Sequence, residues 1–140
     1  SFSKQNKESR EEVKVAEKEE KMIELTEDWA NALKTRDGKP RYEMMSDKAQ
    51  EKFEQEQIEK SGEDWNYNIG YSSPWVINFE IIIDNMTAVI DYVTQTSEPA
   101  YYLKRETVTF VRENGNLVVD DYDTNIESQL IEEPTNMNNH

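Results

Sequence analysis

The spacing of apolar residues changes once along the chain, near residue 67. Before that point apolar residues recur at helical spacing, and the pattern predicts one long helix over residues 9–36. The apolar stripe of this helix is confined to its second half, because the first half, "ESREEVKVAEKEEK", is charged on nearly every side. The stripe consists of Met22, Leu25, Trp29, Ala32 and Leu33.

Two shorter helices are predicted next. The first helix should stop at "RDGKP", with Gly38 in a left-handed cap position and Pro40 beginning a short helix that runs through Met45. Ser46 is then the N-cap of a third helix, "DKAQEKFEQEQIEK", which ends before Gly62. Its expected inward residues are Ala49, Phe53 and Ile58.

From residue 67 onward apolar and polar residues alternate, which predicts antiparallel strands. Turns at Asp84-Asn85 and at Asn114-Gly115 join neighbouring strands into hairpins, so the sheet should be a meander. The pattern leaves open whether Phe110 with Val119 or Val111 with Val118 faces inward. The inner face expected for the first hairpin is Trp75, Ile77, Phe79, Ile81, Ile83, Ala88, Ile90 and Tyr92.

Helices followed by an antiparallel sheet indicate an α+β fold, in which one long and two short helices cover one face of a curved sheet. We expect a single domain over residues 13–124, between a flexible N-terminal tether (1–12) and a flexible C-terminal tail (125–140) that lack apolar periodicity. The helical stripe should pack on the inner sheet face and leave either a filled core or a small cavity. The candidate ligand pocket is formed by Trp29, Tyr42, Met45, Trp75, Phe79 and Tyr92.

Two segments carry a family resemblance. "WANALKTRDGKPRYEMMSDKAQEKF" resembles the helical opening of bacterial nuclear transport factor 2-like domains, and "TVTFVRENGNLVVDDYD" is similar to their last hairpin. The resemblance depends on pattern rather than on a diagnostic motif, and it implies a cone-shaped fold. Similar domains occur in exported penicillin-binding proteins, in membrane-bound antibiotic sensors and as small lipoproteins.

The resemblance also implies a location. It favours an extracytoplasmic domain at the bacterial cell surface, with a lipid anchor upstream of Ser1, and a homodimer is compatible with it. The start "SFSKQNKES" is similar to the polar segment that follows the lipid-modified cysteine of lipoproteins, but it is equally typical of any polar chain end.

Charge excludes some partners. The net charge is −14, and residues 63–140 hold 3 basic and 14 acidic side chains, a balance of −11. An acidic surface of this kind repels phosphate backbones and anionic lipid, so we expect no nucleic-acid partner. No apolar run approaches the roughly 18 residues of a membrane span.

Catalytic signatures are sparse. The chain has no cysteine and its single histidine is His140, which leaves no histidine base for a triad. A carboxylate base is the remaining possibility, and Asp91 stands in an apolar strand. Strand parity turns Asp91 outward beside Glu80, so we expect no inward carboxylate and no catalytic residue.

One acidic run imitates a calcium loop. Asp121, Asp123, Asn125 and Glu132 occupy its first, third, fifth and twelfth positions. Ile126 stands where that loop needs glycine, and a strand precedes it instead of a helix. We therefore expect no metal site and no cofactor.

Two classes of function remain. The first is a non-catalytic binding or accessory module that takes a small apolar ligand or a protein partner. The alternative is a small cofactor-free acid-base enzyme of the polyketide cyclase or ketosteroid isomerase type, which the family resemblance also includes. A buried carboxylate facing the cavity would favour the enzyme.

Overall fold

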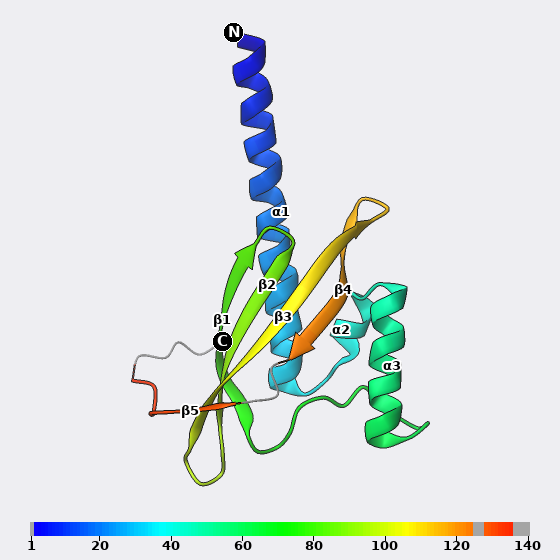
Figure 1. Ribbon diagram of the computed structural model, residues 1–140, viewed down its shortest axis with the longest axis vertical. Helices are drawn as coiled ribbons and strands as arrows, with labels where there is room; N and C mark the ends of the chain where they lie inside the picture. The colour runs from blue at the N-terminus through cyan, green and yellow to red at the C-terminus, as the bar shows by residue number, and fades with distance from the viewer. Residues whose placement is uncertain (1, 125–127, 136–140) are drawn as a thin grey trace.

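The computed structural model describes residues 2–124 and 128–135, and within them the helices precede the sheet (Figure 1). The strands form one antiparallel sheet in the order β1-β2-β3-β4, with β5 added to the free side of β3. This confirms the predicted α+β fold, with one long and two short helices packed on an antiparallel meander. The elements are α1 (Phe2–Thr35), α2 (Lys39–Glu43), α3 (Asp47–Ser61), β1 (Trp75–Asp84), β2 (Thr87–Gln95), β3 (Tyr101–Glu113), β4 (Asn116–Thr124) and β5 (Gln129–Ile131).

Helix α1 is longer than predicted, because it begins at Phe2 rather than at residue 9. Its predicted stripe is confirmed: Met22, Trp29 and Ala32 are buried, and Leu25 and Leu33 are half-buried against the core. Residues 2–17, called here the projecting half of α1, extend away from the body (Figure 1). The expected tether is therefore helical from Phe2 on, and its flexibility stays a prediction. Within the described ranges, no helix is long and apolar enough to cross a membrane.

The inner face of β1 differs from the prediction at its first residues. A bulge between Val76 and Asn78 shifts the register against β2. The extra residue changes which side chains point inward along β1, so that Val76 is buried before the bulge and Asn78 and Phe79 are both buried after it. The expectation that Trp75 and Ile77 belong to the inner face is therefore wrong; both are half-buried outside the core.

The register beyond this bulge agrees with the predicted parity. Phe79 pairs with Tyr92, and Glu80 pairs with Asp91. A second bulge, between Thr109 and Phe110, resolves the last hairpin. Phe110 and Val119 are cross-strand partners and both are buried, so this pair faces inward.

Strand β5 lies in the segment expected to be a tail. It pairs with residues 101–103 of β3, which extend beyond the end of β4 and would otherwise form an unpaired edge. Three residues are too short a run to show a period in the sequence, which is why the strand was not predicted.

The two short helices lie beside β4, the last strand of the meander, where α3 contacts β4 (Figure 1). Ser46 caps α3 as predicted, since its hydroxyl accepts a hydrogen bond from the Ala49 N–H at 3.2 Å. Gly38 is not left-handed, with φ −82°; the left-handed residue after α1 is Arg36, at φ 62°. Gly38 is needed for space instead, because an added Cβ would lie 2.9 Å from both Phe53 and the Tyr67 carbonyl.

Candidate functional site

A pocket of about 230 Å³ opens where the C-terminal end of α1 meets the start of β1. We call it the base pocket, because it lies at the opposite end of α1 from the projecting half (Figure 1). Helix α1, the loop before β1, and strands β1, β2 and β3 all contribute to it. The lining residues are Leu33, Lys34, Arg36, Gly70, Tyr71, Pro74, Trp75, Val76, Thr94, Lys104 and Ser128.

Local backbone geometry holds the pocket wall in place. Arg36 follows α1 in the left-handed conformation, and the Asp37 N–H returns to the Ala32 carbonyl at 3.0 Å, which closes the helix with a Schellman-type end. The Arg36 carbonyl then accepts a hydrogen bond from the Ile69 N–H at 3.2 Å. Gly70 follows at φ 74° and packs on Leu33, so the loop before β1 is fixed to the helix end.

The pocket is cationic in an acidic protein. Lys34, Arg36 and Lys104 line it, whereas none of the described lining residues is a carboxylate. Tyr71 and Trp75 add aromatic surface beside these charges. Lys104 is one of only three basic residues in residues 63–140, a part of the chain whose net charge is −11. The site therefore has the chemistry to hold a small anion with an apolar or aromatic body.

A second polar group lies inside the core and does not line the base pocket. Glu106 on β3 and Arg41 on α2 form an ion pair, with 3.1 Å between Arg41 Nη1 and Glu106 Oε2. The two residues are 2% and 6% exposed. Glu106 Oε1 also accepts hydrogen bonds from Tyr92 at 2.6 Å and from Trp29 Nε1 at 3.0 Å.

Every part of this cluster has a partner. Arg41 Nε donates to the Trp29 carbonyl at 2.9 Å, and its guanidinium lies 4.4 Å from the centre of the Trp29 ring. Arg41 Nη2 donates to the Tyr92 hydroxyl at 3.1 Å. Thr124 supplies a further donor to Glu106 Oε2 at 3.2 Å. The cluster links α1, α2 and three strands.

The cluster keeps Glu106 ionised. Burial by itself would raise the pKa of the Glu106 carboxyl, but the Arg41 charge and the hydrogen bonds from Tyr92, Trp29 and Arg41 outweigh burial and hold that pKa below its ordinary value. Burial and the nearby Glu106 charge raise the pKa of Tyr92 well above its usual range. At neutral pH the pair is therefore a carboxylate and a guanidinium that satisfy each other.

The structure gathers four of the six residues of the predicted pocket, Trp29, Met45, Phe79 and Tyr92, in one buried core, and it places Trp75 outside that core. Trp29 and Tyr92 belong to the Glu106 cluster, and only Trp75 lines the base pocket. Tyr42 packs against the ring of Phe53 on α3, and its hydroxyl donates a hydrogen bond to Glu54 at 2.7 Å. Met45 and Phe79 are buried in the hydrophobic core.

The expectation that no carboxylate faces inward is wrong, because Glu106 is buried opposite the Tyr92 hydroxyl. Glu106 alternates in step with Val108 and Phe110, so its direction depended on whether Phe110 or Val111 faces inward, which the sequence pattern left open. Its partner was not readable, because Arg41 is 65 residues away and in a different element. Asp91 does point outward as predicted, and it pairs with Arg105 at 2.7 Å.

Comparison of the chain with protein-family models, with curated proteins and with solved structures gave no match. The fold class is therefore established by the structure alone, and the nuclear transport factor 2-like resemblance stays a proposal.

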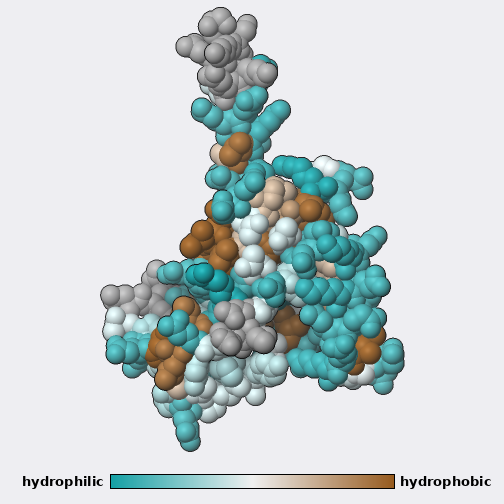
Figure 2. Space-filling view, in the orientation of Figure 1, coloured by the Kyte–Doolittle hydropathy of each residue, from teal (hydrophilic) through white to brown (hydrophobic). Residues whose placement is uncertain are grey.

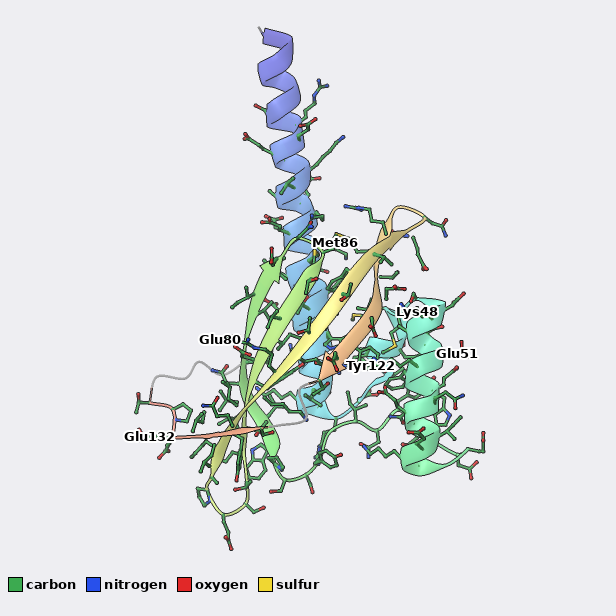
Figure 3. The ribbon with its side chains drawn as sticks, viewed as in Figure 1. Lys48, Glu51, Glu80, Met86, Tyr122 and Glu132 are labelled. Atoms are coloured by element: carbon green, nitrogen blue, oxygen red, sulfur yellow. The ribbon has the colours of Figure 1, made fainter. Side chains whose placement is uncertain are left out.

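The acidic run that begins in the last residues of β4 takes part in other contacts. Asp121 accepts a hydrogen bond from Lys52 at 3.0 Å, which lowers the pKa of the Asp121 carboxyl. Tyr122 lies between β4 and α3, and its hydroxyl donates to Glu56 (Figure 3). Two positions of the calcium-like spacing, Asn125 and Ile126, lie outside the described residues.

Proposed function

We propose that this protein is a non-catalytic binding module that takes a small organic anion in the base pocket. The observation that carries the proposal is the set of three cations, Lys34, Arg36 and Lys104, around a concave site in a chain of net charge −14. Three cations around one pocket attract an anion even though the rest of the protein is acidic. At physiological salt the field of a charge decays over about 8 Å, so the more distant carboxylates have little effect at the pocket. Tyr71 and Trp75 offer aromatic surface to the apolar part of the ligand.

The geometry of Glu106 favours binding over catalysis. A general base works best with a pKa near the operating pH and within reach of its substrate. The pKa of Glu106 is instead lowered, both of its oxygens are hydrogen-bonded, and it is 2% exposed. The acid-base alternative draws support from the Glu106–Tyr92 contact, and it requires Arg41 to move aside.

We place the module outside the cytoplasm and in the nuclear transport factor 2-like group, as an accessory domain or lipoprotein. The order of helices and strands supports the group. The location is proposed because the resemblance to the group implies it. Detection of the full-length product in a lipid-labelled membrane fraction of its native host would test the location.

The ligand class is tested with three probes of one size: 2-naphthoate, 2-naphthol and 2-naphthylmethylamine, which are anionic, neutral and cationic at pH 7. We expect the naphthoate alone to shift the amide resonances of Gly70, Trp75 and Lys104 in a proton–nitrogen NMR titration. Lys104→Glu should weaken this binding about tenfold or more, which corresponds to at least about 1.4 kcal/mol. Lys14→Glu makes the same charge change on the projecting half of α1 and should leave the affinity unchanged.

Equal binding of all three probes, or equal weakening by Lys104→Glu and Lys14→Glu, would refute the anion site. Turnover of a steroid, polyketide or ester substrate that Glu106→Gln abolishes would favour the enzyme instead.

A further inference from the structure

The most buried polar side chain of the base pocket belongs to Thr94 on β2. Thr94 is 5% exposed and lines the pocket. It pairs across the strands with Val76 of β1, which also lines the pocket and is 8% exposed. The other lining residues are half-buried or exposed. Thr94 and Val76 are therefore called here the floor of the base pocket.

The hydroxyl of Thr94 is not used within the protein. Among the described residues it makes no hydrogen bond, whereas the buried hydroxyl of Thr26 donates to the Met22 carbonyl at 2.6 Å. The described side-chain atoms that are sealed from solvent without a partner are Gln57 Oε1 and Asn78 Oδ1, and the Thr94 hydroxyl is not one of them. Since Thr94 lines the pocket, its hydroxyl is open to the pocket and free to bind a ligand.

Strand pairing places Thr94 on the same sheet face as one of the pocket cations. Thr94 alternates along β2 with Ile90 and Tyr92, which are completely buried on the inner face. Tyr92 pairs with Lys104 of β3, so Lys104 and Thr94 are diagonal neighbours on that face. Diagonal neighbours lie about 7–8 Å apart, which allows one small ligand to contact both side chains.

The cationic groups lie farther out than this hydroxyl. Arg36 is exposed, and Lys34 and Lys104 are half-buried. Long basic side chains hold their charge toward water, whereas the hydroxyl of Thr94 is attached directly to Cβ at the floor. The base pocket therefore has a cationic mouth and a hydroxyl at its floor. Figure 2 shows this end of the body as mostly pale, which indicates intermediate hydropathy, beside the strongly hydrophilic surface over α3.

We infer that Thr94 determines the specificity of the base pocket, and that the ligand is an organic acid with a hydroxyl group at the end opposite its acid group. This inference rests on the proposed anion site. The acid group lies among the cations at the mouth, and the opposite end of the ligand covers the floor.

The physical reason is the cost of leaving the Thr94 hydroxyl without a partner. A ligand that fills the pocket removes this hydroxyl from water, and a buried hydroxyl with no hydrogen bond is unfavourable. A ligand hydroxyl can both donate to and accept from the Thr94 hydroxyl, so it restores the lost hydrogen bond. Sites that hydrogen-bond a ligand hydroxyl reject an analogue without it more strongly than an apolar pocket rejects a small change in shape.

The test compares three acids: 2-naphthoate, 6-hydroxy-2-naphthoate and 6-methyl-2-naphthoate. The hydroxyl and methyl groups are similar in size and lie at the end of the ring system opposite the carboxylate. We expect the wild-type chain to bind the hydroxy acid about tenfold or more tightly than the methyl acid, as measured by calorimetric titration.

Three variants identify the group that reads the hydroxyl. Thr94→Val replaces the hydroxyl with a methyl group and should abolish the preference for the hydroxy acid. Thr94→Ser retains the hydroxyl and should retain the preference. Thr26→Val makes the same change at a buried threonine that does not line the pocket, and it should also retain the preference. A proton–nitrogen NMR spectrum of each variant verifies that it is folded.

The outcomes separate this inference from the anion site. If 2-naphthoate binds but the hydroxy and methyl acids bind equally, the inference about Thr94 is overturned and the anion site stands. A preference that Thr94→Val leaves intact, or that Thr94→Val and Thr26→Val abolish alike, overturns it in the same way. If none of the three acids binds, the anion site and this inference are both overturned.

Discussion

Arg41 and Glu106 form an ion pair in the middle of an apolar core. Removing both charges from water is costly, and the pair is tolerated because Trp29, Tyr92 and Thr124 complete its hydrogen bonds. The two charges therefore favour the observed packing of α2 against β3, because another packing would leave a buried charge without its partner. The sequence pattern left the direction of Glu106 undecided, because it did not decide between Phe110 and Val111 on the same strand. It also cannot reveal a partner that only the fold brings close.

The buried Arg41–Glu106 pair predicts a large loss of stability when one of its two charges is removed. Glu106→Gln leaves the buried Arg41 guanidinium without a counter-charge and should lower the free energy of unfolding by about 3–5 kcal/mol. The same change in an Arg41→Met background should cost much less, because no unpaired charge remains. Denaturant unfolding at neutral pH measures both. A loss below about 1 kcal/mol for Glu106→Gln would show that the pair contributes little.

The same variant has a pH signature. Because the pKa of Glu106 in the folded protein is below its ordinary value of 4.5, the stabilisation is present above that value. It is lost as the pH falls below 4.5 through the folded pKa. The difference between wild type and Glu106→Gln should be constant at neutral pH and shrink in acid. A difference that grows on acidification would contradict the assignment.

At the scale of elements, the sequence predicts which segments are helix or strand better than it predicts register. The stripe of α1, the Ser46 cap and the two hairpin turns follow from local chemistry, so they were predictable. The bulges at residues 76–78 and 109–110 depend on pairing with a neighbouring strand, and no residue type marks them. One bulge alone moved Trp75 from the core to the base pocket and so changed the predicted site.

Gly38 offers a test at this scale, because it has ordinary backbone angles and no free space. Gly38→Ala should cost about 1–3 kcal/mol, since the added methyl group meets Phe53 and the Tyr67 carbonyl. Gly62 has the opposite properties, with φ 80° and nothing within 4 Å of an added Cβ. Gly62→Ala should cost about 1–3 kcal/mol from the backbone alone, because its φ of 80° and ψ of −172° are adopted readily only by glycine. Thermal or denaturant unfolding measures both variants, and a Gly38→Ala protein as stable as wild type would contradict crowding at Gly38.

At the scale of the whole molecule, the sequence predicts an α+β domain with helices on one sheet face, and the structure confirms it. The position of the pocket was not predictable, because it forms where three distant segments meet: the end of α1, the loop before β1, and Lys104 on β3. Such a convergence depends on how the elements pack, and hydrophobic periodicity contains no information about it.

The projecting half of α1 should be dispensable for folding. Side chains from Ser9 to Glu17 are exposed, so they contribute little to the core. Deleting residues 1–12 should change the free energy of unfolding by less than about 0.5 kcal/mol. Equilibrium unfolding of the shortened chain measures this, with deletion of residues 1–24, which removes the buried Met22, as the destabilising control. A large loss in the shorter deletion would reveal a contact made by the N-terminal end.

Because α1 is long, charges at its N-terminal end have little effect on the electrostatic potential at the base pocket. At 1.5 Å per residue its 34 residues span about 50 Å, and Leu33 and Lys34 at its last turn line the pocket. Potentials in physiological salt decay over about 8 Å, so the far end lies several decay lengths away. A charged surface at the N-terminal end, such as an anionic bilayer, therefore exerts a negligible electrostatic force on an anion that approaches Lys104. The three cations can therefore set the affinity of the site by themselves, whatever the charge of the surroundings at the other end.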